Sequence, residues 1–399
     1  MLTAPGDFTH ARHFAGARHA LAQAQSLPPW THTDPRFFAR EMERIFRRHW
    51  LFAGDADRIS KPGDWWSTAL AGVPVLLARG RDGAVRAFAN TCRHRGCRLV
   101  PPGEGNARAF KCGYHGWVYN LDGALAGAPQ MEHSKDFDKS AYGLVAIRAA
   151  LWGKFVFLCF DANAPPFEEA QGGFLRMFQG YEFDRLVTAR RARIRVRCNW
   201  KIYAENLMES YHIPYVHAAS IAGNDFDPGM EALAGKSGGL YGRTPGQPVW
   251  LDFGPNHGAI VSRHAGSNAL LPNERGFPAM PGLSGVAAEG SYFAYPFPCA
   301  LIAGNIDCLW TVGINPLSAG ETELTLAHHF HQATMARPDF AELSQAYYRR
   351  LDAATAEDVV ITEEQQRGLD SPFARPGRLS HMEPVVHEFR RWIVDQVAD

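Results

Sequence analysis

The chain reads CRHRGC at residues 92–97 and CGYHGW at residues 112–117, and these two stretches decide the fold of its first half. Each places a cysteine and a histidine within one tight turn, Cys92 with His94 and Cys112 with His115, and 17 residues separate His94 from Cys112. Glycines beside both pairs let the backbone pass close to a bound group. The spacing therefore predicts one metal group held between two loops.

The ligand types indicate a [2Fe-2S] cluster. Two thiolates can hold one iron of such a cluster and two neutral imidazoles the other, which raises the reduction potential relative to an all-cysteine cluster. A tetrahedral zinc site could use the same four side chains. Zinc fingers, however, carry a spaced histidine pair on a helix, whereas both pairs here are Cys followed by His on expected loops. We therefore favour the cluster.

The sequence around these loops is typical of a small all-β module. From Trp50 to about Asp161, short apolar runs alternate with turn signals such as KPGD, PPGEGN and NLDGAL. The candidate strands are VPVLLAR, VRAFAN, ARAFKC, GWVYNL, YGLVAIRA and KFVFLCF. Ahead of this module, apolar residues recur at helical spacing between Phe37 and Phe46, which predicts a helix with one buried stripe.

A second domain is expected after the turn-rich segment at 161–166. Its pattern is helical at FEEAQGGFLRMFQGY, strand-like at LVTARRARIRVRC and helical again at NWKIYAENLMESYH. Residues 224–290 are rich in Gly and Pro, which predicts long loops that could wall a pocket. Strands are expected again at SYFAYPF, ALIAGNI, CLWTVGINPL and TELTLAHHF, and helices over about 338–368 and 383–397.

Composition excludes several classes of protein. Lys plus Arg and Asp plus Glu both number 41 in the 399 residues, so the formal charge is zero and the basic stripe that nucleic acid binding requires is missing. The seven cysteines are too scattered for a disulfide framework. We find neither a signal peptide nor an apolar run that could span a bilayer, so a cytoplasmic protein is expected.

A second metal site is predicted at His212 and His217. The two histidines are five residues apart, and on an unbroken helix their side chains would diverge by about 140°. Pro214 lies between them, and because proline breaks helices it could bend the chain until both rings face one metal. Two histidines and one carboxylate on one face are the ligands of non-heme Fe(II) oxygenases, which keep other positions free for O2.

The carboxylate must come from elsewhere in the chain. The late helix offers four acidic residues, among which composition does not choose: Glu357, Asp358, Glu363 and Glu364. Another dense group, His328, His329 and His331, is interpreted as a solvated strand or helix end rather than a metal site. No flavin or nicotinamide motif is visible, so a reductase is expected to be a separate protein.

The first constellation resembles the Rieske family, whose pattern is C-x-H, a linker and C-x2-H. The chain meets it at Cys92, His94, Cys112 and His115. Rieske proteins of respiratory complexes add a disulfide between the loops; Cys97 could supply one half, but Tyr114 occupies the place of the other. The chain thus resembles the oxygenase branch. Cys97 is expected to be a buried free thiol, and Trp117 is expected to shield the cluster from water.

The resemblance extends into the second domain. Rieske oxygenases carry N-W-K, E-N, an acid-x-Y-H-x4-H and, much later, an Asp followed by a Q-R-G-L-like segment. The chain has NWK at 199–201, EN at 205–206, ESYHIPYVH at 209–217, and Asp358 ahead of QRGL at 366–369. This match implies that Asp358 is the third iron ligand beside His212 and His217, with Glu357 as the main competitor.

The resemblance implies an α+β fold in three parts. Residues 1–45 are expected to form a helical segment that packs on the catalytic domain. Residues 46–162 would form the small all-β Rieske domain that holds the [2Fe-2S] cluster. Residues 163–399 would form the mononuclear iron domain, with an antiparallel sheet wrapped around a long helix in the helix-grip manner.

The family also implies an electron relay. An acid at the position of Glu209 accepts hydrogen bonds from His115 of the adjacent subunit and from His212 of its own chain, so the functional unit would be a homotrimer. Glu209 lies three residues before His212 and would share a helix face with it. Asn206, one turn earlier, would support the open side of the iron. Electrons would come from a separate flavin or iron–sulfur reductase, with or without a ferredoxin.

The substrate is less sharply defined by the sequence. Most of the family has Asp where this chain has Glu209, and the glutamate points to choline, carnitine and betaine oxygenases. Six aromatic residues could cage a quaternary ammonium or stack on an aromatic ring: Trp250, Phe253, Tyr292, Phe293, Tyr295 and Phe297. Betaine demethylases, however, usually place cysteines where this chain has Ser210 and Ile213.

Three functions therefore stay open at this point. We favour monooxygenation of a small quaternary ammonium or N-methyl compound with O2. The alternative is hydroxylation of an aromatic ring or aromatic acid. A Rieske ferredoxin-type electron carrier is the alternative from another class, but a carrier has no need of the second iron. Whether a β subunit accompanies the chain is also open.

Overall fold

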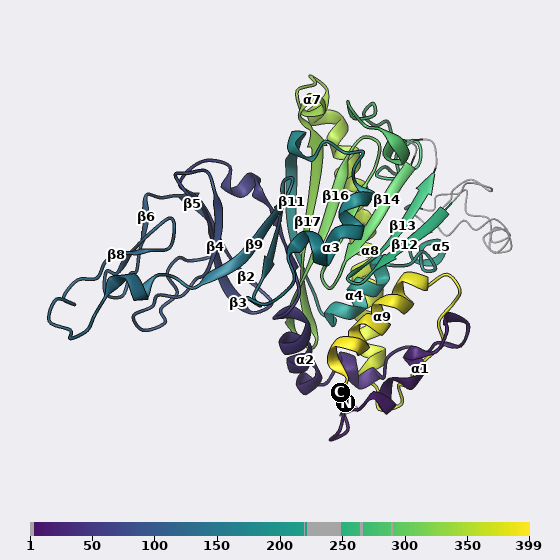
Figure 1. Ribbon diagram of the computed structural model, residues 1–399. Coiled ribbons are helices and arrows are strands. Elements are labelled where there is room, and N and C mark those ends of the chain that lie inside the picture. The colour runs from purple at the N-terminus through teal and green to yellow at the C-terminus, as the bar shows by residue number, and fades with distance from the viewer. Residues whose placement is uncertain (1–3, 219, 222–248, 264–265, 289) are drawn as a thin grey trace. The chain divides into compact units, whose positions relative to one another are not determined.

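The computed structural model describes residues 4–218, 220–221, 249–263, 266–288 and 290–399. The chain divides into two compact units (Figure 1). One unit comprises Arg47–Ala164, and the other combines Met1–Phe46 with Pro165–Asp399. Each unit has its own antiparallel sheet, so each can be described by itself.

The Arg47–Ala164 unit is built from strands. Its larger sheet has the order β1-β10-β9-β4-β3-β2-β5, and the strands are β1 Leu51–Asp55, β2 Asp64–Leu70, β3 Val73–Arg79, β4 Val85–Ala89, β5 Gly103–Asn106, β9 Ala146–Trp152 and β10 Phe155–Cys159. A small sheet joins β6 Ala109–Lys111, β7 Val118–Asn120 and β8 Leu125–Gly127. One buried core contains residues of both sheets, among them Leu76, Phe88 and Tyr119.

The second unit contains a seven-stranded antiparallel sheet. Its order is β11-β17-β16-β15-β14-β13-β12, with β11 Leu186–Val196, β12 Val249–Gly254, β13 His257–Arg263, β14 Gly290–Pro296, β15 Ala300–Gly304, β16 Leu309–Ser318 and β17 Glu321–His331. Its α-helices are α1 Ala15–Arg18, α2 Pro35–Glu41, α3 Phe167–Met177, α4 Trp200–Leu207, α5 Ile213–Val216, α7 Gln332–Met335, α8 Phe340–Leu369 and α9 Pro384–Val397. The 30-residue α8 is the longest of these.

Short helices complete the described chain. They are η1 Ala11–Phe14, η2 Leu21–Gln23, η3 Pro29–His32, η4 Met42–Phe46, η5 Ala56–Ile59, η6 Lys139–Tyr142, η7 Phe183–Arg185 and η9 Gly285–Ala288. Among the residues that the structure describes, none of the helices combines the length and the apolar character that crossing a bilayer would require.

Helices cover both faces of the seven-stranded sheet. Tyr292 on β14 lies against Phe178, which follows α3, with ring centroids 5.7 Å apart. The next residue, Phe293, lies against Trp310, and the Arg350 guanidinium of α8 sits over that indole. Because successive residues of a strand point to opposite faces, α3 and α8 must lie on opposite sides of the sheet. The sheet packed on a long helix confirms the expected α+β architecture.

Buried hydrogen bonds and ion pairs hold helix α4 on the face of the sheet that α8 covers. The Tyr295 hydroxyl donates to the carbonyl of Leu207 at the end of α4 at 2.6 Å, and Tyr295 shares the face of Phe293. Arg390 of α9 makes a bidentate ion pair with Glu205, with N–O distances of 2.9 and 2.6 Å. One turn earlier, the fully buried Lys201 ammonium contacts Glu41 at 2.6 Å. These contacts set where the chain leaves α4.

The structure corrects the expectation for residues 199–217. Helix α4 ends at Leu207, and His212 and His217 flank the short helix α5 rather than lying on one continuous helix. Pro214 is in the first turn of α5. A proline is tolerated there because the first turn needs no hydrogen bond from its nitrogen, so Pro214 begins a helix instead of breaking one.

Two further expectations were wrong. The Gly- and Pro-rich stretch at 224–290 contains the hairpin β12–β13 within its described part, and its residues 224–248 lie outside the described residues. The histidine cluster is not solvated: His328, His329 and His331 are at most 4% exposed on β17. Strand β17 lies inside the sheet, paired with β11 and β16. His328 contacts the Tyr347 carbonyl of α8, whereas His329 points to the other face and contacts Thr188 and Thr311.

Candidate metal centres

The two Cys-and-His loops of the first unit have the same backbone conformation. The N–H of Cys92 donates to the carbonyl of Cys97 and the N–H of Gly96 to that of Cys92, at 2.8 and 3.0 Å. In the second loop the N–H of Cys112 donates to Trp117 and that of Gly116 to Cys112, at 2.7 and 3.0 Å. Gly96 and Gly116 have φ values of +74° and +73°, which only glycine adopts without strain.

The loops bring their side chains together in two matched pairs. Cys92 and Cys112 are each 2% exposed, whereas the Nδ1 atoms of His94 and His115 lie 3.1 Å apart nearer the surface. Burial raises the pKa of the Cys112 thiol, but backbone N–H groups of the loop and the neighbouring Cys92 outweigh burial and lower it. Two buried sulfurs and two converging imidazole nitrogens fit a [2Fe-2S] cluster with mixed ligands.

Trp117 and Tyr119 flank these four residues. The Trp117 indole is buried and stacks on the His94 ring, with centroids 5.0 Å apart and planes 9° apart, as expected of a residue that excludes water. The Tyr119 oxygen accepts from the Arg93 N–H at 2.9 Å and lies 3.3 Å from the Cys92 sulfur, so its hydroxyl would donate to that sulfur in the thiolate form. Hydrogen bonds to ligand sulfurs tune cluster potentials. Sequence reasoning missed Tyr119, whose only signal is its inward position on β7.

Cys97 differs from its expected state in one respect. It forms no disulfide, as predicted, but it is partly exposed rather than buried. Its sulfur lies at the end of the first loop, outside the buried pair Cys92 and Cys112.

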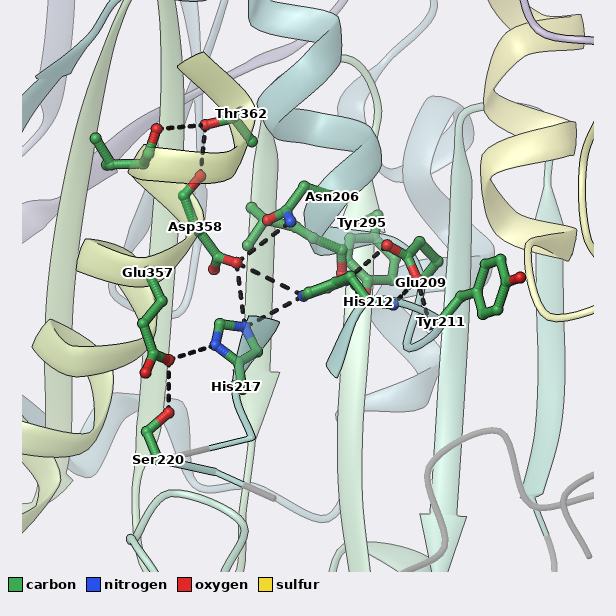
Figure 2. Close-up of polar contacts among 12 residues, drawn as sticks. Asn206, Glu209, Tyr211, His212, His217, Ser220, Tyr295, Glu357, Asp358 and Thr362 are labelled. Atoms are coloured by element: carbon green, nitrogen blue, oxygen red, sulfur yellow. Dashed lines mark hydrogen bonds and ion pairs between the residues drawn. The ribbon is translucent and has the colours of Figure 1, made fainter. Parts of the chain in front are cut away.

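In the second unit, His212, His217 and Asp358 converge on one point (Figure 2). The Nε2 atoms of the two imidazoles are 3.2 Å apart. The Asp358 Oδ1 atom lies 3.6 Å from Nε2 of His212 and 3.1 Å from Nε2 of His217. Their ligand atoms all lie within 4.8 Å of one another, although α8 is more than a hundred residues from α5 in the sequence.

Acidic side chains surround the two imidazoles. Glu209 Oε1 contacts Nδ1 of His212 at 2.5 Å, and Glu357 Oε2 contacts Nδ1 of His217 at 2.6 Å (Figure 2). Burial opposes protonation of His217, but Asp358 and Glu357 outweigh burial and raise the pKa of its imidazole. Three carboxylates beside two histidines are a set of ligand types that favours a divalent cation.

Asn206 adds a second reason to place a metal here. Its Nδ2 donates to Asp358 Oδ1 at 3.2 Å. Its Oδ1 is buried with no hydrogen-bond partner among the described residues, and such an orphan acceptor is costly unless a further group is bound. The expectation that Asn206 shares a helix with Glu209 was wrong, because α4 ends between them. Glu209 instead folds back and accepts from the N–H groups of Tyr211 and His212.

The aromatic residues named from the sequence are not all at one place. Tyr292, Phe293, Tyr295 and Phe297 are buried on or just after β14, but Phe253 is 42% exposed. Trp250 lies on β12. Tyr295 has the most direct link to the metal site, since its hydroxyl holds the end of α4.

Comparison with known proteins finds a family model in each unit of the chain. Residues 49–139 match the model of the Rieske [2Fe-2S] domain, and residues 183–399 match the model of the ring-hydroxylating alpha subunit, catalytic domain. The chain belongs to the Rieske oxygenase alpha subunits. It is therefore an oxidoreductase that uses O2, with a [2Fe-2S] cluster and a mononuclear iron, and Rieske oxygenases receive their electrons from a separate reductase.

Relatives of this Rieske oxygenase cover nearly all of it. The chloroplastic choline monooxygenase of Amaranthus tricolor is 30% identical over 375 residues, which is 92% of this chain and 76% of that protein. The glycine betaine monooxygenase oxygenase subunit of Chromohalobacter salexigens is 28% identical over 402 residues, covering 96% and 89%.

Solved structures share the fold of this Rieske oxygenase. The quaternary ammonium Rieske monooxygenase CntA in complex with L-carnitine has a TM-score of 0.73 at 23% identity, with full coverage of both chains. Naphthalene 1,2-dioxygenase from Rhodococcus sp. bound to indole has a TM-score of 0.75 at 20% identity, covering 99% of each chain.

Proposed function

We propose that this Rieske oxygenase inserts one oxygen atom of O2 into a small quaternary ammonium or N-methyl compound. Two relatives that match most of the chain support the proposal: one is a choline monooxygenase and the other is a glycine betaine monooxygenase oxygenase subunit. Glu209, in the place where most of the family has Asp, agrees with that branch.

The observation that carries the oxygenase assignment is the convergence of His212, His217 and Asp358. We assign these three side chains as the ligands of the mononuclear iron. Asp358 is preferred to Glu357 because its Oδ1 faces the Nε2 atoms of both imidazoles, whereas Glu357 faces only the Nδ1 side of His217. Two histidines and one carboxylate leave coordination positions free.

The cluster ligands follow from the loops of the first unit. We assign Cys92 and Cys112 to one iron of the [2Fe-2S] cluster, and His94 and His115 to the other. We further assign residues 46–162 to the cluster domain, residues 163–399 to the iron domain and residues 1–45 to a segment packed on the iron domain. The compact units Arg47–Ala164 and Met1–Phe46 with Pro165–Asp399 support these boundaries.

Side chains around the proposed iron ligands hold the ligands in position and offer hydrogen bonds. Glu209 fixes the His212 ring through Nδ1, and its backbone contacts with Tyr211 and His212 hold the carboxylate in place. Asn206 is the supporting group nearest Asp358, with a free amide oxygen that can accept a hydrogen bond from a bound water or substrate. When bound, the cluster supplies single electrons and the iron activates O2.

The assembly we propose is a homotrimer in which the relay runs from His115 of one subunit through Glu209 to His212 of the next. His115 is exposed at the tip of its loop, and the Glu209 carboxylate is 12% exposed. Glu209→Gln should leave both metals bound but slow electron transfer to the iron, because the amide carries no charge.

The electron donor would be a flavin or iron–sulfur reductase, and the cytoplasmic location stays a prediction.

Hydroxylation of an aromatic ring is the second candidate. The likeness to naphthalene 1,2-dioxygenase concerns the fold alone, and buried aromatic side chains can stack on a ring as well as cage a cation. The electron-carrier alternative lacks support, because the catalytic-domain match and the converged triad add a second metal site that a carrier does not need.

Substrate-dependent O2 uptake with a heterologous reductase tests the proposal. Choline, glycine betaine and carnitine should stimulate uptake, whereas 3,3-dimethylbutanol, which has the shape of choline but no charge, should not. Benzoate and salicylate serve as aromatic competitors. Uptake with the aromatic acids alone would overturn the substrate class and leave the oxygenase assignment standing.

A further inference from the structure

The His217 imidazole is clamped between two consecutive carboxylates of α8. Asp358 contacts its Nε2 atom at 3.1 Å and Glu357 contacts its Nδ1 atom at 2.6 Å (Figure 2). The Ser220 hydroxyl donates to the same Glu357 oxygen at 2.5 Å. We propose that Glu357, held by Ser220, is the positioning residue of His217, fixing the orientation and tautomer in which this histidine binds the iron. This inference rests on the proposed function of the site.

The tautomer follows from the donor and acceptor roles. An ionised carboxylate only accepts hydrogen bonds, so the Nδ1 atom that contacts Glu357 must carry the hydrogen. In a neutral imidazole the lone pair is then on Nε2, and Nε2 is the atom that faces Asp358 and Nε2 of His212. Without Glu357 both tautomers would be accessible, and one of them presents an N–H to the metal. Metal-bound histidines commonly have such a carboxylate on the second nitrogen.

The same arrangement occurs at His212. Glu209 contacts its Nδ1 atom at 2.5 Å and leaves Nε2 directed at the point of convergence. Each iron histidine therefore has its own glutamate. The glutamates differ in sequence distance: Glu209 is three residues from its histidine, whereas Glu357 is 140 residues away on α8. Glu357 thus acts across the fold and ties α5 to α8.

Geometry separates a positioning role from a ligand role for Glu357. Consecutive residues of a helix point about 100° apart, and here Glu357 and Asp358 reach opposite nitrogens of one ring. The Glu357 oxygen already accepts from the imidazole and from Ser220. Ser220 is itself placed by a turn, since its N–H donates to the carbonyl of His217 at 3.1 Å.

Metal binding to the intact chain tests this inference without measuring turnover. Protein with the cluster in place and the mononuclear iron removed is titrated with Co(II), and isothermal titration calorimetry measures the affinity, because the cluster absorption would hide the visible bands of Co(II). Glu357→Ala should weaken Co(II) binding by about 10–100-fold, the usual cost of losing the partner of a ligating histidine. Glu357→Gln should recover most of the affinity, because its amide oxygen accepts from both Nδ1–H and the Ser220 hydroxyl. Ser220→Ala should cause a smaller loss than Glu357→Ala.

Glu364→Ala is the matched control, because Glu364 lies on the same helix and pairs with Arg367 at the surface. Its affinity for Co(II) should equal that of the unchanged chain. Unchanged affinity in Glu357→Ala, or an equal loss in Glu357→Gln, would overturn the positioning role. If Glu357→Ala abolished binding while Asp358→Ala retained it, the ligand set itself would be wrong, and the proposed function of the site would fail with it.

Discussion

Each imidazole of the proposed iron site has a carboxylate beside Nδ1 and directs Nε2 to the same point. This arrangement explains why the pKa of the His217 imidazole is raised although the side chain is only 2% exposed: Asp358 and Glu357 favour the charged ring and outweigh burial. A histidine must be deprotonated at the nitrogen that binds a metal, so iron binding competes with protonation of this ring. Iron binding should depend most on the Asp358 side chain, since its Oδ1 lies near Nε2 of both histidines.

Replacing Asp358 should empty the mononuclear site and leave the cluster intact. Asp358→Ala removes the only carboxylate that faces both Nε2 atoms among the described residues, so the iron content should fall from about three to about two per chain. The visible absorption of the cluster should stay unchanged. Iron analysis and absorption spectra check this, with Glu364→Ala as a control that keeps all its iron. Loss of the cluster absorption together with the third iron would contradict the assignment.

Helix α4 positions Asn206 beside Asp358, and Glu209 of the proposed relay follows its end. Its position depends on the Glu205–Arg390 pair, whose side chains are 7% and 8% exposed. Arg390→Met leaves the Glu205 charge buried without its bidentate partner and should lower the free energy of unfolding by about 3–5 kcal/mol. Urea unfolding measures the change. Arg391→Met, at the neighbouring exposed position, should change stability little, and an equal loss there would argue against a specific buried pair.

Strand β17 supplies a pH-dependent contribution to stability. Burial, together with the Arg190 and Arg350 charges, lowers the pKa of His328 to about 4, against the opposing effects of the Tyr347 carbonyl and Asp352. Because the unfolded chain binds this proton near pH 6.5 and the folded chain does not, stability is lost as the pH falls through this window. At pH 5 the loss should be about 2 kcal/mol.

His328→Gln removes this titration and serves as the test. The variant should lose less stability than the unchanged chain between pH 7 and pH 5, whatever its stability at pH 7. Urea unfolding at both pH values gives the difference. Parallel pH profiles for the two proteins would show that His328 does not titrate in this range.

At the scale of the whole molecule, the question is whether electrons pass within a chain or between chains. Co-expression of a Cys112→Ser chain, which lacks the cluster, with an Asp358→Ala chain, which lacks the iron, answers it. Each variant alone should be inactive. In mixed cyclic trimers about a quarter of the activity should return, because half the chains have a working iron and half of their neighbours a working cluster.

Transfer within one chain gives a different result in that experiment. No chain in the mixture then holds both metals, and the mixed protein stays inactive. Size-exclusion chromatography with light scattering supplies the oligomeric state that the interpretation needs. A monomeric active enzyme would contradict the proposed relay between His115 and Glu209.

The local sequence could predict the structure of segments that depend on contacts between residues close together in the chain. Turn chemistry and strand periodicity act over a few residues, so the sequence could predict the Cys-and-His loops at 92–97 and 112–117 and strands around them. It could also predict that His212 and His217, five residues apart, approach one point. The end of α4 at Leu207 could not be predicted from residues 199–217. That end depends on the buried contacts of Glu205 and of the Leu207 carbonyl with distant elements.

The sequence by itself determined the two sets of metal-binding residue types and the α+β fold. Only the tertiary structure decided which of the adjacent acids Glu357 and Asp358 faces Nε2 of His217. It also decided that the histidines of β17 are core residues and that Glu209 reaches His212 outside a helix. The physical reason is common to all three. Neighbouring residues of the same type differ only in the direction of their side chains, and packing against distant segments sets that direction.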